Sequence, residues 1–272
     1  MNFNIRQAPN GVWYGSFPEF DRLGVRHGFA TRLGGASEGP YKSLNLVFRA
    51  RDEVENVIGN RRKFCEAVGV DLTRAVGGHQ VHGDRVGVVA PGDAGKGAAS
   101  SDGLEGTDAL ITNVPGVPLM IFFADCVPLL LVDPVRKAVG ACHAGWRGTV
   151  ARIGAKTVQA MERHFGTRPQ DCRIALGPSI GPCCYEVDDS VMNRFREAFD
   201  WWEAAAVRRG EKWLLNLWEA NRRQLIDAGV PAGNIAMSDA CTACNTPLFF
   251  SYRAENGDTG NLAAVISLQE GC

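Results

Sequence analysis

Apolar residues recur every three to four positions in four stretches of the chain, which is the spacing of an amphipathic helix. The stretches run from Asp52 to Gly69, from about Gly148 to His164, after Asp188 or Asp189, and between Asn216 and Gly229. Asp and Asn side chains accept hydrogen bonds from the first turn of a helix, and glycine readily adopts the left-handed conformation that ends one. The pattern therefore predicts four helices with these boundaries.

Short apolar runs bounded by Gly, Pro, Asp or Asn fill the middle of the chain and predict strands over 108–112, 117–123, 128–132, 138–142 and 173–176. The glycine-rich residues 90–107 are expected to form a surface loop between two strands. Consecutive strands followed by helices favour an α+β fold, a layered α/β sandwich with mixed β-sheets. We expect a single domain spanning residues 1–272. Neither a G-x-G-x-x-G after a strand nor a Walker motif supports nucleotide binding by those routes.

The composition restricts the possible binding partners but says little about the reaction. The 272 residues carry a net charge of -1 with scattered Lys and Arg, so no nucleic-acid partner is expected. The longest apolar stretch, 114–123, contains two prolines and is too short to cross a bilayer. No signal peptide is recognisable, so we expect a cytoplasmic protein without a membrane partner. The nine cysteines are an odd number without an export signal, which predicts reduced thiols.

Three residues far apart in the chain are the main candidates for chemistry: His82, Cys126 and His143. Each lies where an apolar run gives way to small or polar residues. In an extended segment Gln80 and His82 would share a face and His79 would point the other way, so we choose His82. Two imidazoles and a thiolate are a ligand set that zinc accepts, with a fourth position left open. The same residues could also form a cysteine nucleophile with a histidine base. The residues alone do not decide between a zinc site and such a nucleophile.

Arg147, Asp125 and a C-x-x-C motif are further candidates for roles at the site or beside it. Arg147 lies in the turn from a predicted strand to a predicted helix, next to His143, and its guanidinium suits a phosphate or a carboxylate. Asp125 follows an apolar run and would need a partner if buried. Cys241 and Cys244 form a C-x-x-C, but a structural zinc site would want a second pair at suitable spacing, which the sequence lacks. We therefore expect these two cysteines to be structural or to support the site.

At these residues the chain resembles the laccase-domain family, also described as multicopper polyphenol oxidases and as purine nucleoside phosphorylases of the YfiH type. The matching motifs run along nearly the whole chain: HGFATRLGG at 27–35, SLNL at 43–46, QVHG at 80–83, ADC at 124–126, CHAGWR at 142–147, residues 177–186, and FFSYR at 249–253. One departure is visible, because Asn261 stands where the family often has Arg.

The resemblance implies a zinc ion held by His82, Cys126 and His143. It also implies phosphorolysis of adenosine, inosine, guanosine and methylthioadenosine, together with deamination of adenosine, so the expected partners are a purine nucleoside and phosphate. Copper is the alternative metal, but five histidines fit a four-copper oxidase poorly.

Arg147 is the residue that we expect to hold phosphate, a placement inferred from the turn and not from the family. Arg32, Asn45 and Asp125 are further candidates for substrate contacts or for support of the ligands.

Two other functions stay open beside the phosphorylase, and polyphenol oxidation is a further alternative. The protein could be a metal-free cysteine amidase acting on a cell-wall precursor, with Cys126 as nucleophile, His143 or His82 as base, and Asp125 or another group orienting the base. It could also be a binding module that senses a nucleotide or a metal without turnover.

Overall fold

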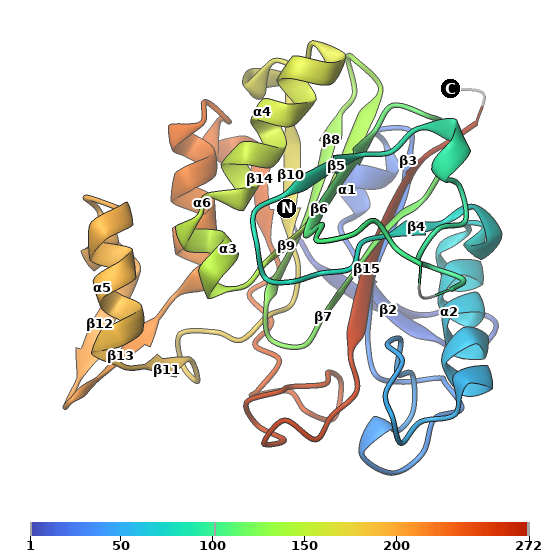
Figure 1. Ribbon diagram of the computed structural model, residues 1–272, viewed down its shortest axis with the longest axis horizontal. Coiled ribbons are helices and arrows are strands. Elements are labelled where there is room, and N and C mark those ends of the chain that lie inside the picture. The colour runs from blue at the N-terminus through green and yellow to red at the C-terminus, as the bar shows by residue number, and fades with distance from the viewer. Residues whose placement is uncertain (1, 101, 271–272) are drawn as a thin grey trace.

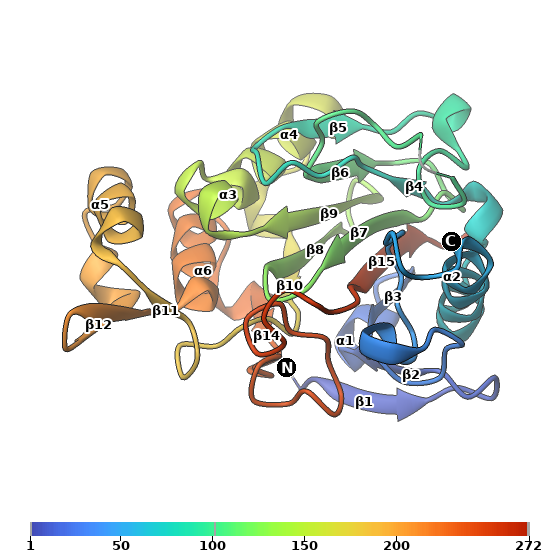
Figure 2. The same ribbon diagram turned by 60° about the horizontal axis from the view of Figure 1, so that its bottom comes forward.

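Two mixed six-stranded sheets packed face to face form the centre of the fold (Figures 1 and 2). The computed structural model describes residues 2–100 and 102–270. The first sheet has the order β1 (Asn4–Gln7), β2 (Trp13–Ser16), β3 (Val25–Ala30), β15 (Leu262–Leu268), β7 (Leu119–Phe123) and β4 (Val76–Gly77). The second has the order β14 (Ile235–Met237), β10 (Arg173–Leu176), β8 (Val127–Asp133), β9 (Ala138–Ala144), β6 (Ala109–Thr112) and β5 (Val86–Val88).

Parallel pairs sit at the edges of sheets that are otherwise antiparallel. β4 runs parallel to β7 in the first sheet, and β5 runs parallel to β6 and β14 to β10 in the second. A small third sheet joins β11 (Glu186–Val187), β13 (Lys212–Leu215) and β12 (Ala206–Arg209). With helix α5 (Asp189–Ala198) it stands at the end of the molecule opposite α2 in Figure 1.

The strands of the second sheet are buried on both faces, as a sheet covered on both sides requires. In β8, Leu130 and Val132 pack into the core shared with the first sheet. Their neighbours Leu129 and Leu131 pack on the other side, among residues of the helices. Successive side chains of a strand point to opposite faces, so one apolar run supplies both cores.

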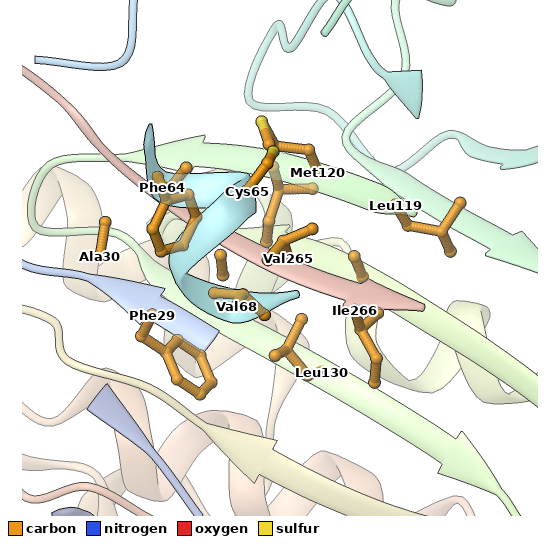
Figure 3. Packing of buried hydrophobic residues seen from close by; sticks show 14 of the residues in the cluster. Phe29, Ala30, Phe64, Cys65, Val68, Leu119, Met120, Leu130, Val265 and Ile266 are labelled. Carbon is orange, nitrogen blue, oxygen red and sulfur yellow. The ribbon is translucent and has the colours of Figure 1, made fainter. Parts of the chain in front are cut away.

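Helices cover the outer faces of both large sheets and complete a four-layered arrangement. α4 (Ile153–Phe165) and α6 (Leu217–Asp227) lie against the second sheet, and α2 (Val54–Val68) lies against the first (Figure 1). Figure 3 shows Phe64, Cys65 and Val68 of α2 above the strands that carry Phe29 and Val265. The other α-helices among the described residues are α1 (Pro18–Asp21) and α3 (Trp146–Val150). The predicted layered α/β sandwich with mixed sheets is confirmed.

The helix predictions hold with two corrections. α2 ends at Gly69, which has a left-handed φ of 81°, but its N-cap is Glu53. Asp52 accepts hydrogen bonds from Ser37 Oγ (2.8 Å) and Asn45 Nδ2 (2.6 Å), so its carboxylate ties a loop instead of a helix end. The expected helix over 148–164 is divided into α3 and α4, because Arg152 adopts a left-handed φ of 60° between them.

Two helices have the predicted caps. Asp188 accepts from the backbone N–H groups of Ser190 and Val191 at the start of α5, and Asn216 accepts from Glu219 N at the start of α6. Among the described residues, no helix is both long enough and apolar enough to cross a membrane.

The strand predictions were less complete. β10 has the predicted bounds, but β9 continues through His143 to Ala144, so this histidine lies in a strand and not in the turn after it. The segment around His82 was expected to be extended and is a bent loop, with His82 itself at φ 60°. The predicted strands correspond to β6–β10, and β1–β5 and β11–β15 were not predicted.

Candidate metal and active site

His82, Cys126 and His143 meet at one end of the second sheet. Their potential ligand atoms all lie within 4.8 Å of one another, and the two imidazole rings are 4.9 Å apart between centroids. Cys126 immediately precedes β8, and His143 lies in the antiparallel neighbour β9, opposite Pro128. The pairing of β8 with β9 thus brings two of the groups together, and the 80–83 loop brings the third.

Asp108 holds both histidines, although the sequence analysis did not select it. Its Oδ1 lies 2.9 Å from His143 Nδ1 and accepts from His82 N (3.0 Å), while its Oδ2 accepts from Val81 N (3.0 Å) and Gly83 N (2.9 Å). Burial alone would raise the pKa of this carboxyl, but the hydrogen bonds from His143, Gly83 and Val81 lower it. With Nδ1 of His143 occupied by a carboxylate, its Nε2 is left for a metal or for Cys126.

The thiol and the imidazole beside it stabilise one another's charged forms. Burial alone would raise the pKa of Cys126, but the neighbouring His143 and the hydrogen bonds from His143 and His82 lower it to about 6. Burial would likewise lower the pKa of His143, but Cys126 and Asp108 raise it to about 9. The site therefore favours a thiolate, which is the form in which cysteine binds metals and acts as a nucleophile.

Because Gly145 has no side chain, there is room beside it for Cys126 and His82. A Cβ at this position would lie 2.8 Å from Cys126 Sγ, closer than such atoms approach, and in a tight contact of 3.2 Å with His82 Cδ2. Two non-glycine residues at the site, His82 and Asp125, have left-handed φ values of 60° and 80°. Backbone strain of this kind persists where the surrounding structure enforces it, and it is common at functional sites.

Asp125 supports the site through its backbone and its carboxylate. Its carbonyl accepts from Ile180 N (2.9 Å), its Oδ1 from Thr242 Oγ1 (2.6 Å) and its Oδ2 from Arg253 N (2.7 Å). Both carboxylate oxygens thus fasten the segments at Thr242 and Arg253 beside Cys126. Burial raises the pKa of Asp125, against these hydrogen bonds.

A cavity of about 860 Å³ opens in front of the three-ligand cluster. Its lining includes six aromatic residues, which are Phe48, Phe122, Phe123, Trp146, Tyr185 and Tyr252. It also includes four arginines, at positions 49, 61, 147 and 253, whereas Asp125 is the one carboxylate among the described lining residues. The cavity therefore combines flat apolar surfaces with an excess of positive charge.

The predicted site residues fall into two groups. Arg147 is exposed, lines the cavity and lies with its guanidinium carbon 4.5 Å from the ring centroid of Trp146. Asp125 lines the cavity too. Arg32 and Asn45 lie outside the lining.

Arg32 bonds to Thr246 O (2.9 Å) and Glu255 (2.9 Å), and the amide of Asn45 bonds to Val47, Asp52 and Asn261 N. These contacts favour a structural role for both residues. Asn261 lines the cavity and accepts a hydrogen bond from Arg49, so a guanidinium is present beside this position.

The family model described as "Multi-copper polyphenol oxidoreductase laccase" matches residues 26–269. The chain belongs to this family. A relative from Geobacillus stearothermophilus named "Purine nucleoside phosphorylase YlmD" is 40% identical over an alignment of 254 residues that covers 91% of this chain and 91% of that one. A relative named "Adenosine deaminase RL5", from an unknown prokaryotic organism, is 38% identical over 219 residues, covering 78% of this chain and 82% of that one.

Solved structures of the laccase-like family share the whole fold. The crystal structure of YlmD from Geobacillus stearothermophilus has a TM-score of 0.91 at 38% identity and covers 98% of this chain and 99% of its own. A hypothetical protein YfiH from Bacillus licheniformis gives the same TM-score and identity, with coverage of 97% and 99%. The predicted family membership is confirmed.

Proposed function

We propose that this protein is a zinc-dependent purine nucleoside phosphorylase that also deaminates adenosine, with its active site at His82, Cys126 and His143. The observation that carries the proposal is the position of these groups at the base of a cavity with aromatic and cationic walls. The names of the two relatives, a purine nucleoside phosphorylase and an adenosine deaminase, support the choice of substrate.

The cavity suits both substrates of a phosphorolysis. Aromatic side chains such as Trp146 and Tyr185 offer faces on which a purine ring can stack. Arg147 is exposed and lines the cavity, so its guanidinium can hold phosphate. A phosphate oxygen would then attack C1′ of the ribose as the bond from C1′ to the purine nitrogen breaks and the base departs. The arginines would stabilise the phosphate throughout.

The donor set fits zinc. One thiolate and two imidazoles are typical of catalytic zinc, and Asp108 behind His143 is the carboxylate support that such ligands commonly have. Zinc at such a site supplies Lewis acidity and lowers the pKa of a water molecule, which deamination requires. A four-copper oxidase would need more imidazoles than the five histidines in the sequence, so polyphenol oxidation is the weaker alternative.

A nucleoside panel tests the activity. The purified protein is incubated with adenosine, inosine, guanosine or methylthioadenosine, with and without phosphate, and the products are separated by chromatography. We expect free base and ribose 1-phosphate only with phosphate, and inosine from adenosine without it. Failure to convert any of the four nucleosides under either condition would refute the proposal.

One observation favours a second candidate, a metal-free cysteine hydrolase. A chain of contacts like that of a catalytic triad runs from Asp108 through His143 to Cys126. Burial would raise the pKa of Cys126, but the neighbouring histidines outweigh this effect and lower it to about 6. In that reading Asp108, and not Asp125, orients the base. The two candidates respond differently to inhibitors: a metal-free hydrolase acting on an amide loses activity to iodoacetamide and keeps it in a zinc chelator.

A further inference from the structure

Four cysteines from two loops gather beside the active site without belonging to the three-ligand cluster. Cys183 and Cys184 lie in the loop that follows β10, and Cys241 and Cys244 lie in the segment that follows β14. Because β10 and β14 are parallel neighbours, these loops leave the same edge of the second sheet. The four Sγ atoms all lie within 4.8 Å of one another. Cys183 and Cys184, adjacent in the chain, are thus the second pair of thiols that the C-x-x-C motif lacks in the sequence pattern.

The backbone holds the two loops in register around the sulfurs. Ser179 forms an isolated parallel bridge with Cys241, in which Thr242 N donates to Ser179 O (2.9 Å). Gly181 N donates to Cys241 Sγ (3.2 Å), a contact that stabilises negative charge on sulfur. A Cβ on Gly181 would lie 3.2 Å from Cys183 Sγ, so the glycine keeps space free at the cluster.

The spacing of the sulfurs matches a shared metal ion better than a disulfide. Cys244 Sγ lies 3.4 Å from Cys183 Sγ and 3.3 Å from Cys184 Sγ. Bonded sulfurs are about 2.05 Å apart. Sulfurs around a tetrahedral zinc, each about 2.3 Å from the metal, are roughly 3.8 Å apart. A small contraction or expansion of the cluster would bring all four thiolates to that geometry.

We propose that Cys183, Cys184, Cys241 and Cys244 bind a structural zinc ion that fastens these two loops together. The neighbours of the ligands show what such a clamp would position. Thr242, next to Cys241, donates to Asp125, and Tyr185, next to Cys184, lines the cavity. The ion would thus hold one wall of the active site without touching substrate. The inference does not depend on the proposed activity, since it concerns a separate set of ligands.

Metal analysis of variants separates the two sites. We expect about two zinc ions per chain in the purified protein and about one in Cys126→Ala. The double variant Cys183→Ser with Cys244→Ser changes two exposed thiols, and it should also keep about one while its melting temperature falls. Cys65→Ala removes a buried thiol outside both clusters and should keep both ions. Zinc lost from the double variant and kept in Cys126→Ala supports the proposal even if the first site holds another metal.

X-ray absorption at the zinc edge of Cys126→Ala gives a second readout that needs no change to the cluster. We expect a shell of sulfur alone at about 2.3 Å. Two results would overturn the proposal. One is a Cys126→Ala protein without zinc. The other is a mass and a thiol count that show disulfides among these four cysteines in the native protein.

Discussion

The hydrogen bonds of Asp108 make one substitution especially informative. Asp108→Asn keeps the size of the side chain but replaces one acceptor oxygen by a donor NH2 group. The two oxygens now serve His143 Nδ1 and three backbone N–H groups, those of Val81, His82 and Gly83. In either orientation of the amide, two of these four contacts would place a donor against a donor.

The magnitude follows from the contacts that are lost. A hydrogen bond to a buried charged group contributes about 1.5–3 kcal/mol, and two are lost here. Replacing a group that supports a metal ligand lowers metal affinity by about 10- to 100-fold. We therefore expect the zinc affinity of the Asp108→Asn site to fall by at least about tenfold, and phosphorolysis to fall with it. Part of the lost hydrogen-bond energy will also lower the melting temperature of the variant.

Competition with a coloured zinc chelator measures the affinity, and Asp133→Asn is the matched control. Asp133 is also fully buried in the second sheet, and its Oδ1 accepts from Val135 N and Arg136 N. Its Oδ2 has no hydrogen-bond partner among the described residues, so an amide nitrogen there costs no existing contact. The account of Asp108 is refuted if Asp108→Asn and Asp133→Asn bind zinc at the active site within twofold of the wild-type protein.

Three further predictions follow from single sites. Gly145→Ala would place a Cβ 2.8 Å from Cys126 Sγ, so metal affinity at this site, measured by the same competition, should fall by about tenfold or more. Arg147→Ala should raise the KM for phosphate by about 10- to 100-fold in steady-state assays, because it removes a charge-assisted contact. Burial lowers the pKa of His27 to about 4, partly opposed by Asp21, so its contribution to stability is complete above pH 6.5 and is lost as the pH falls toward 4. Urea unfolding should show wild-type protein losing about 2–3 kcal/mol more than His27→Gln between pH 7.5 and 4.5.

Each of these has a control or a result that would contradict it. A Cβ at Gly59 in α2 meets nothing within 4 Å, so Gly59→Ala should leave metal affinity unchanged. Arg194 is an exposed arginine paired with Glu197 on α5, and Arg194→Ala should leave the KM for phosphate unchanged. A larger effect at Arg194 than at Arg147 would contradict the placement of phosphate. Equal pH dependence of wild type and His27→Gln would show that this imidazole is not held neutral in the fold.

Sequence patterns predicted the elements whose signals are local. The glycine after α2, the Asp188 cap of α5 and the Asn216 cap of α6 each act within one turn of the helix, so the chain itself reveals them. The break at Arg152 depends on a left-handed backbone conformation that nothing in the neighbouring sequence requires. Strands β3 and β15 pair across almost the whole length of the chain, and no local signal reports that pairing.

In the site, too, residue types could be recognised from the sequence, whereas long-range contacts could not. The candidate ligands were chosen by residue type, and the structure brings His82, Cys126 and His143 together. Asp108 was missed because its role lies in contacts with loop 80–83 and with β9, although a charged residue at the start of a buried strand was a usable signal. The four-cysteine cluster was missed because its two halves meet only through the parallel pairing of β10 and β14.

The most direct test of the central claim combines metal content and turnover in Cys126→Ala. The wild-type protein and the variant are purified in parallel, their zinc is quantified, and phosphate-dependent release of hypoxanthine from inosine is followed. The account predicts that the variant folds, contains about one zinc ion fewer per chain than the wild-type protein, and releases no hypoxanthine. A folded Cys126→Ala protein that cleaves inosine at the wild-type rate would contradict it.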